Sequence, residues 1–241
     1  MKLNISKFMD LDEVKRLWRA DLPTPIDVLN LIHFKDAEAY RWYAVMVFPT
    51  LKAVGGRVGW FGLHSESFLG EPQAEELGVV RYPNQRRFLS LVLNPYYVAV
   101  ASPQRMKAVQ RFNASFTHSP CSLDALSRSR WVLAVHHKAG PGATAALEKL
   151  MTTLGGQLVY HSTETSEINI AKRYHPANSN PIAFADTALV SYPSEEACQD
   201  AITAGALNQL KEVVGPEVSA QLYRRLYRSE SFPAPLTRFV R

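Results

Sequence analysis

The sequence has few of the features that mark specialised classes of protein. Only two of its 241 residues are cysteines, Cys121 and Cys198, and they are too far apart for a CxxC motif or a zinc site. This usage is typical of free thiols in a reducing compartment. No run approaches the roughly 20 apolar residues that span a bilayer, and the N-terminus carries charge where a signal peptide needs an apolar core. We therefore expect a cytoplasmic protein with no membrane partner.

The common catalytic and cofactor motifs are also missing. There is no GxSxG, no Walker A loop, no GxGxxG, and no HxH or HExxH spacing of a metal site. The net charge of +5 is basic, but the 27 lysines and arginines are scattered, and the densest pairs are Arg86-Arg87 and Arg224-Arg225. Such pairs are too short for a nucleic-acid-binding arm. We expect no bound metal, no nucleic-acid partner and no cofactor, with haem as the alternative.

What the sequence does contain is an ordered series of strand and helix signals from Ile26 to Pro83. Nearly continuous apolar runs indicate buried strands, and apolar residues three and four apart indicate a helix. Gly55-Gly56 ends that helix, because glycine supplies the positive φ common at helix C-termini. The polar stretch His64–Glu76 is expected to form a loop. The predicted elements are Val28–Lys35, Ala37–Val54, Arg57–Leu63 and Leu77–Tyr82.

More elements are predicted on either side of this series. An amphipathic helix is expected within Ser6–Ala20, with Asp10 as its N-cap. After the third strand we expect two helices, Asn84–Leu93 and one within Val98–Val109, and then a strand within Arg111–Phe116.

A degenerate copy of the series runs from Trp131 to Pro193. The first strand ends alike in both, Leu31-Ile-His-Phe-Lys35 against Ala134-Val-His-His-Lys138, and Gly155-Gly156 repeats Gly55-Gly56. The third match is Thr187-Ala-Leu-Val-Ser-Tyr-Pro193 against Gly78-Val-Val-Arg-Tyr-Pro83, and three matched signals in the same order indicate an internal repeat. By analogy, the last strand of the copy is expected around Arg224–Glu230.

Each half thus has the strand–helix–strand, strand–helix–strand order of a ferredoxin-like unit. The sheet of such a unit has one face without helices, and a second copy in the same chain can cover it. We therefore predict an α+β fold in which two tandem ferredoxin-like repeats form a pseudo-symmetric barrel. The expected segments are an N-terminal helix (1–25), a first repeat (26–116), a linker (117–129), a second repeat (130–232) and a C-terminal tail (233–241).

The first half resembles the bacterial proteins grouped as domain of unknown function 1330, which belong to the dimeric α+β barrel superfamily. The similarity covers Ile26–Met106, whereas the second half resembles the superfamily only through the internal repeat. The residues that carry it are Phe34-Lys-Asp-Ala-Glu-Ala-Tyr40, Tyr43, Pro49, Gly55-Gly-Arg-Val58, Val79-Val-Arg-Tyr-Pro83 and Asn94-Pro-Tyr-Tyr97.

The resemblance implies a barrel fold but no single reaction. The superfamily includes cofactor-free monooxygenases, isomerases, haem-handling and chlorite-dismutase-like enzymes, and ligand sensors, and fold alone does not choose among them. The leading hypothesis is a cofactor-free oxygenase or isomerase that acts on an apolar or aromatic metabolite in the barrel cavity. The alternatives are a haem-binding enzyme and a non-catalytic ligand-binding or interaction protein. The N-terminal helix adds weight to a homodimer or partner contact.

Polar residues inside predicted strands are the best candidates for the site, because a buried polar group needs a partner or a function. Asn30 and Arg81 interrupt apolar strands and are expected to hold the polar end of the substrate. His64, after the second strand, is the expected base. The aromatic lining would come from Trp60, Tyr97 and Tyr160. For the haem alternative, the axial ligand would be His175 or His161.

Structural roles remain open for the same residues. Asn30 and Arg81 could instead satisfy local backbone groups or pair with a carboxylate. His33 and His136 occupy matching positions in the repeat, and each is expected to face solvent or a loop at the end of its strand.

Overall fold

The computed structural model describes residues 9–71, 74–162, 164–166, 168, 170, 186–226 and 233. Within this part of the chain, no helix is both long enough and apolar enough to cross a membrane.

The first ferredoxin-like unit runs from β1 to β4 and is called the first unit. Capping side chains begin its helices, since Asp36 accepts a hydrogen bond from the backbone of Ala39 and Asn84 from that of Arg87. A π-helix, η2, leads directly into α4, so the predicted helix within Val98–Val109 consists of two pieces. The elements are β1 (Ile26–Phe34), α2 (Ala37–Ala53), β2 (Arg57–Leu69), β3 (Glu76–Tyr82), α3 (Gln85–Val92), η2 (Tyr97–Ala101), α4 (Ser102–Ala108) and β4 (Val109–His118).

The second unit runs from β5 to β9 and repeats this order with small additions. A short 3-10 turn, η3 (Pro141–Ala143), precedes its first helix, and its second helix is split in two. The elements are β5 (Trp131–His137), α6 (Thr144–Thr153), β6 (Gln157–His161), β7 (Glu164–Ser166), β8 (Asp186–Tyr192), α7 (Glu195–Ala201), α8 (Ala204–Val214) and β9 (Val218–Arg225).

All strands belong to one antiparallel sheet in the order β6-β8-β5-β9-β2-β3-β1-β4-β7. Each unit contributes the ferredoxin-like order, β4-β1-β3-β2 or β9-β5-β8-β6, and the long β2 crosses over to pair with β9. Only two residues separate β6 from β7, which pairs with β4 at the other end of the order. This short connection holds the two ends of the sheet near one another, so the sheet curves into the predicted barrel of two ferredoxin-like repeats.

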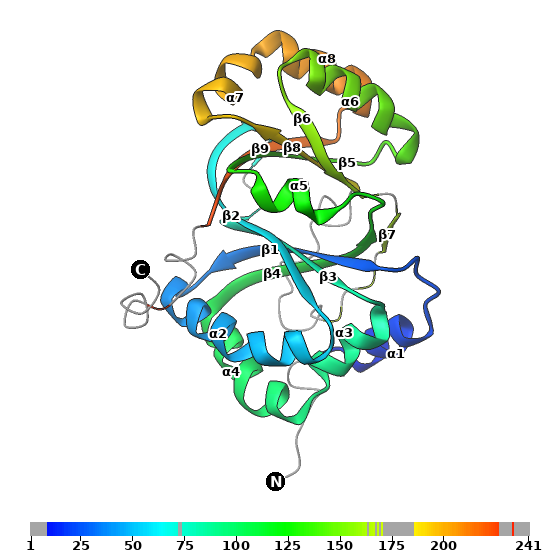
Figure 1. Ribbon diagram of the computed structural model, residues 1–241, viewed down its shortest axis with the longest axis vertical. Helices are drawn as coiled ribbons and strands as arrows, with labels where there is room; N and C mark the ends of the chain where they lie inside the picture. Colours follow the sequence, from blue (N-terminus) through cyan, green and yellow to red (C-terminus); the bar gives the residue numbers. More distant parts are fainter. Residues whose placement is uncertain are drawn as a thin grey trace.

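Three apolar clusters follow from this closure. Helices cover the outer face of each unit, and Figure 1 shows α2–α4 and α6–α8 at opposite ends of the molecule with the sheet between them. One cluster fills the outer layer of the first unit, and another fills that of the second. The third fills the barrel interior and includes Leu29, Leu31, Trp60, Leu77, Val79, Leu126, Tyr160 and Tyr223.

Two helices lie outside the repeat. α1 (Leu11–Arg19) is capped by Asp10, as predicted, and buries Val14 and Leu17. α5 (Leu123–Arg128) lies in the segment expected to be a linker, and Figure 1 shows it between the two halves of the sheet. Its Leu126 is fully buried in the barrel interior. The connection between the units therefore helps to fill the barrel.

Two predicted boundaries are wrong. β2 continues through Leu69, although His64–Glu76 was expected to be a loop, because its polar second half pairs with β9. The last strand lies at Val218–Arg225, earlier than the expected Arg224–Glu230. In both cases the length and position of the strand depend on pairing between the two units. Such pairing leaves no signal in the local sequence.

Candidate functional site

Arg81 on β3 lies opposite Asp27 on β1, on the inner face of the barrel. The guanidinium donates two hydrogen bonds to the fully buried carboxylate, Nε to Oδ1 at 2.7 Å and Nη2 to Oδ2 at 2.8 Å. It also donates to the backbone carbonyls of Cys121 at 3.1 Å and Ser119 at 3.3 Å. Bidentate Arg–carboxylate pairs are strong and directional. Arg81 therefore pairs with a carboxylate, as one of the two expected roles had it, and holds the 119–121 loop in place.

This loop presents Cys121 to His161, the last residue of β6. The thiol Sγ lies 3.4 Å from Nδ1 of His161, and both side chains are partly exposed. Burial acts to raise the pKa of Cys121, but hydrogen bonds from His161 and Ser119 outweigh it and lower the pKa. The hydrogen bond to Cys121 raises the pKa of His161. Both shifts favour a thiolate–imidazolium pair, the activated form of a cysteine.

Trp60 and Tyr160, two of the predicted aromatic lining residues, do face the barrel interior. They pair with Val79 and Leu189 at matching positions of the two units. The indole Nε1 of Trp60 donates to the carbonyl of Ser129 at 3.0 Å. Each buried residue of the interior cluster to which they belong is at most 8% exposed. These aromatics thus act as core between the described strands.

The hydroxyl of Tyr160 is a polar exception in this core. This hydroxyl is buried, and no described group lies at a distance and angle that would make a hydrogen bond to it. Burial, together with the nearby carboxylate of Asp27, raises its pKa well above the usual value. Tyr160 therefore stays protonated next to the Arg81–Asp27 pair, directly before His161 in the chain.

His64 does not share a site with Arg81. Arg81 is opposite Arg57 on β2, and His64 lies seven positions further along that strand, which is about 20 Å at roughly 3.3 Å per residue. The Nε2 of His64 lies 2.9 Å from Ser67 Oγ and 3.1 Å from Gln221 Oε1. The sheet register therefore does not bring the two predicted catalytic residues together.

Asn30 and Tyr97 also lie away from the barrel interior. Asn30 is three residues from Asp27 on β1, so the alternation of a strand turns it to the opposite, helix-covered face. Its amide donates to the carbonyl of Val28 at 3.1 Å, which is the local role considered above. Tyr97 belongs to the outer cluster of the first unit. These two residues cannot line a barrel cavity.

The histidine pair of the repeat has diverged. His33 is partly exposed, contacts Arg111 and lies 3.8 Å from the carboxylate of Glu75. His136 was expected to face solvent, but it is only 2% exposed, and its Nδ1 lies 2.9 Å from Thr187 Oγ1. The expectation is wrong because β9 and β8 both flank β5 and cover its end.

The residues proposed as haem ligands do not form a haem site in the described part of the chain. His161 directs Nδ1 at Cys121, and the adjoining barrel interior is filled by side chains. His175 lies outside the described residues. No group of three metal-binding side chains occurs among the described residues either.

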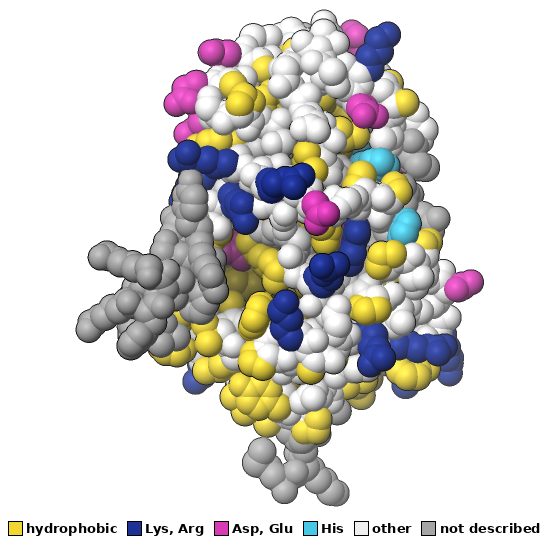
Figure 2. All heavy atoms as spheres, viewed as in Figure 1, with side chains coloured by type: hydrophobic (Ala, Val, Ile, Leu, Met, Phe, Trp, Pro, Cys, Tyr) yellow, Lys and Arg dark blue, Asp and Glu magenta, His cyan; other side chains and the backbone are white. Residues whose placement is uncertain are grey.

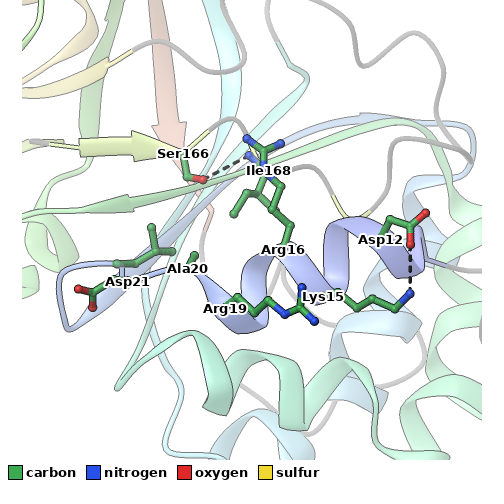
Figure 3. Close-up of a pocket in the computed structure, with 9 residues that line it drawn as sticks. Asp12, Lys15, Arg16, Arg19, Ala20, Asp21, Ser166 and Ile168 are labelled. Carbon is green, nitrogen blue, oxygen red and sulfur yellow. Dashed lines mark hydrogen bonds and ion pairs between the residues drawn. The ribbon is translucent and has the colours of Figure 1, made fainter.

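A pocket lies beside α1, outside the barrel. It has a volume of about 610 Å³ and is lined by Asp12, Lys15, Arg16, Arg19, Ala20, Asp21, Leu22, Ser166 and Ile168. Figure 3 shows charged side chains of α1 on one side and Ser166 and Ile168 on the other. Lys15 pairs with Asp12 at 3.2 Å and both are largely exposed, so this is a solvated surface.

Comparisons with known proteins give weak similarities. No family model matches the chain, and no curated protein is similar to it. A protein of unknown function from Rhodopseudomonas palustris is 26% identical over 42% of this chain and 88% of its own, with a TM-score of 0.39. A candidate monooxygenase from Lactobacillus acidophilus is 12% identical over 84% and 94%, with a TM-score of 0.48. An anthrone oxidase-like protein is 11% identical over 85% and 92%, with a TM-score of 0.47.

The Cys121–His161 pair has no signal in the sequence as a pair. The two residues are 40 positions apart, and Cys121 lies in the segment that reads as a linker. Only the repeat gave a hint, because it placed His161 at the end of a strand facing the barrel mouth.

Proposed function

We propose that this chain is a small-molecule enzyme of the cofactor-free isomerase kind, and that Cys121 and His161 are its catalytic residues. The supporting observation is the 3.4 Å contact between a partly exposed thiol and an imidazole whose pKa values shift in opposite directions. An ion pair of this type offers a base, the thiolate, beside an acid, the imidazolium. Proton transfer within a metabolite needs both groups.

The proposed step is a proton shift next to a carbonyl group. The thiolate of Cys121 takes a proton from the carbon beside the carbonyl, and the imidazolium of His161 donates its proton at a second position of the resulting enolate. The new thiol then returns its proton to the imidazole across the same contact. Atoms and electrons balance without an oxidant, a reductant or a cofactor.

The surrounding residues support this reaction without taking part in it. Arg81 and Ser119 fix the backbone of Cys121, and Asp27 fixes Arg81. We assign Arg81 as a positioning residue.

The pair is tested by thiol alkylation with iodoacetamide at pH values from 5 to 9. Cys198 is an internal control, since it is fully buried and burial raises its pKa to about 12. We expect alkylation at Cys121 to be at least about 1,000-fold faster at pH 7, because the thiolate is the reactive form. His161→Asn should shift the alkylation profile of Cys121 to higher pH, whereas Cys198→Ala should leave it unchanged. Equal profiles for wild type and His161→Asn would contradict the ion pair.

The reaction class is tested separately with a panel of aromatic and aliphatic ketones in D2O, followed by NMR. We expect deuterium to enter the position beside the carbonyl of a substrate, and Cys121→Ser to abolish this exchange. Oxygen consumption without exchange would instead favour the oxygenase class. Neither exchange nor oxygen consumption, with a ligand still bound, would favour a non-catalytic binding protein.

A further inference from the structure

A second polar cluster lies in the outer layer of the first unit, between α2, η2 and α4. Its centre is Arg105 on α4, which is 6% exposed. The guanidinium Nε is buried without a hydrogen-bond partner, and the ion pairs between described residues do not include this arginine. Arginine remains charged at all physiological pH values. A buried charge of this kind normally has a partner of opposite sign.

The groups that surround Arg105 do not neutralise it. The ionisable groups that act on Arg105 electrostatically are the phenols of Tyr97, Tyr43 and Tyr40. Burial raises the pKa of Tyr40 and Tyr43 well above the usual value, so both remain neutral hydrogen-bond donors. The remaining contact is the ring of Phe112, whose centroid lies 5.0 Å from the guanidinium carbon. An aromatic face attracts the cation but carries no net charge.

Hydroxyl groups gather at the same place. The hydroxyls of Tyr43 and Tyr97 lie 3.4 Å apart and share one hydrogen bond between α2 and η2, so the accepting hydroxyl keeps its own proton free to donate. Ser102 lies three residues before Arg105, on the same face of α4, and its buried Oγ has no partner. Tyr43 is partly exposed, so the cluster lies just beneath the surface formed by α2.

A buried carboxyl group of this layer does not change the balance. Glu76 is the first residue of β3, and burial raises its pKa to about 8, with Arg41 acting in the opposite direction. It is therefore mostly uncharged at pH 7. Among the described residues, the cation, the hydroxyl groups and the aromatic walls of this cluster have no ionised carboxylate as a partner.

We propose that Arg105, Ser102 and the paired hydroxyls of Tyr43 and Tyr97 form an internal binding site for the carboxylate group of a small, mainly apolar molecule. The guanidinium supplies the opposite charge, and the hydroxyls supply directed hydrogen bonds. The rings of Tyr40, Tyr97 and Phe112 contact the apolar part of the ligand. This site is separate from Cys121 and His161 and does not depend on their proposed role.

The test measures thermal unfolding of the full chain with sodium benzoate, acetate, phosphate or chloride at equal ionic strength. A ligand at a hundred times its Kd raises Tm by roughly 5–10 °C for a chain of this size. We expect such a rise with benzoate, a smaller one with acetate, and none with chloride. Arg105→Met should remove the rise, while Arg57→Met, which removes an exposed arginine, should keep it.

Three outcomes would overturn the proposal: no rise with either carboxylate, an equal rise in Arg105→Met, or a rise with phosphate alone, which would indicate an inorganic oxyanion site. If Arg105→Met does not fold, calorimetric titration of benzoate into Tyr97→Phe replaces it. We expect a Kd about tenfold weaker than wild type, because one hydrogen bond to a charged group is lost. Tyr192→Phe, a buried tyrosine of the second unit, should bind benzoate like wild type. Unchanged binding by Tyr97→Phe would also overturn the proposal.

Discussion

The two units build the same strand order but fill their outer layers differently. In the second unit the layer between the sheet and the helices is mainly apolar, with Leu147, Met151, Val190, Leu210, Val214 and Leu222 at its centre and one buried phenol, Tyr192. In the first unit the corresponding layer buries an arginine, a carboxyl group, a serine and several phenols, namely Arg105, Glu76, Ser102, Tyr40, Tyr82 and Tyr97.

The surfaces of the two halves of the chain differ in how many large hydrophobic side chains they expose. The large hydrophobic side chains most exposed among the described residues all belong to the first half of the chain: Leu11, Trp18, Phe48, Val58, Tyr96 and Val100. In the view of Figure 2, hydrophobic side chains gather over the part of the molecule where Figure 1 places α2 and α4. The first unit is therefore less well optimised for stability than the second, both inside and outside.

The comparison provides an internal control. The second unit shows that the fold needs no buried charge in this layer, and burying one without a partner costs several kcal/mol. Natural proteins tolerate such costs mainly at functional sites. The buried polar groups of the first unit therefore point to binding and not to the architecture.

The largest expected effect concerns Glu76. Burial raises its pKa from the usual 4.5 to about 8 in the folded protein, so the folded state holds its proton more tightly. Stability should fall as pH rises from about 4.5 to 8, by up to about 5 kcal/mol. Glu76→Gln should remove this loss, and it should be several kcal/mol more stable than wild type at pH 8.5 but similar at pH 4. Urea unfolding at both pH values measures this.

The control for Glu76 is Glu212→Gln on α8, an exposed position of the second unit. We expect its free energy of unfolding to stay within about 0.5 kcal/mol of wild type at both pH values. If Glu76→Gln behaves in the same way, the first unit does not bury an unfavourable carboxylate.

The second expected effect concerns His136 and has the opposite sign. Burial, with a smaller effect of His137, lowers the pKa of His136 from 6.5 to about 4. The contribution of neutral His136 to the free energy of unfolding is fully present above pH 6.5. About 3 kcal/mol of it is lost as the pH falls toward 4. In His136→Gln, the urea concentration at the midpoint of unfolding should change much less between pH 6.5 and 4 than it does in wild type. Retention of the whole decrease would assign it to other groups, such as His137 beside Asp186.

The smallest expected effect uses a matched pair of glycines. Gly55 and Gly155 end the equivalent helices α2 and α6 with φ of 78° and 75°. Alanine at either position should cost about 1–2 kcal/mol, because L-residues avoid this conformation. Gly55→Ala should cost more, since a Cβ would lie 3.2 Å from Pro83 Cγ, whereas at Gly155 nothing lies within 4 Å. Thermal unfolding of both variants gives the difference, and a larger cost at Gly155 would contradict this crowding.

The sequence predicted the repeated architecture because its signals are local. Periodicity, caps such as Asp10 and Asp36, and the two Gly-Gly pairs each act within one element. It failed where distant strands decide the outcome. The register that separates His64 from Arg81, and the closure that joins Cys121 to His161, both depend on pairing across the barrel. The sequence does not predict the burial of Arg105, because a buried arginine in a helix does not change the spacing of the apolar residues.

The closure of the barrel within one chain has a further consequence. In a barrel assembled from two identical chains, every substitution occurs twice and assembly weakens on dilution. Here the connection through α5 keeps the units at a high effective concentration, so their association does not depend on protein concentration. Each unit can change sequence independently of the other. Inheritance as a single chain thus allows one unit to specialise while its neighbour remains a scaffold.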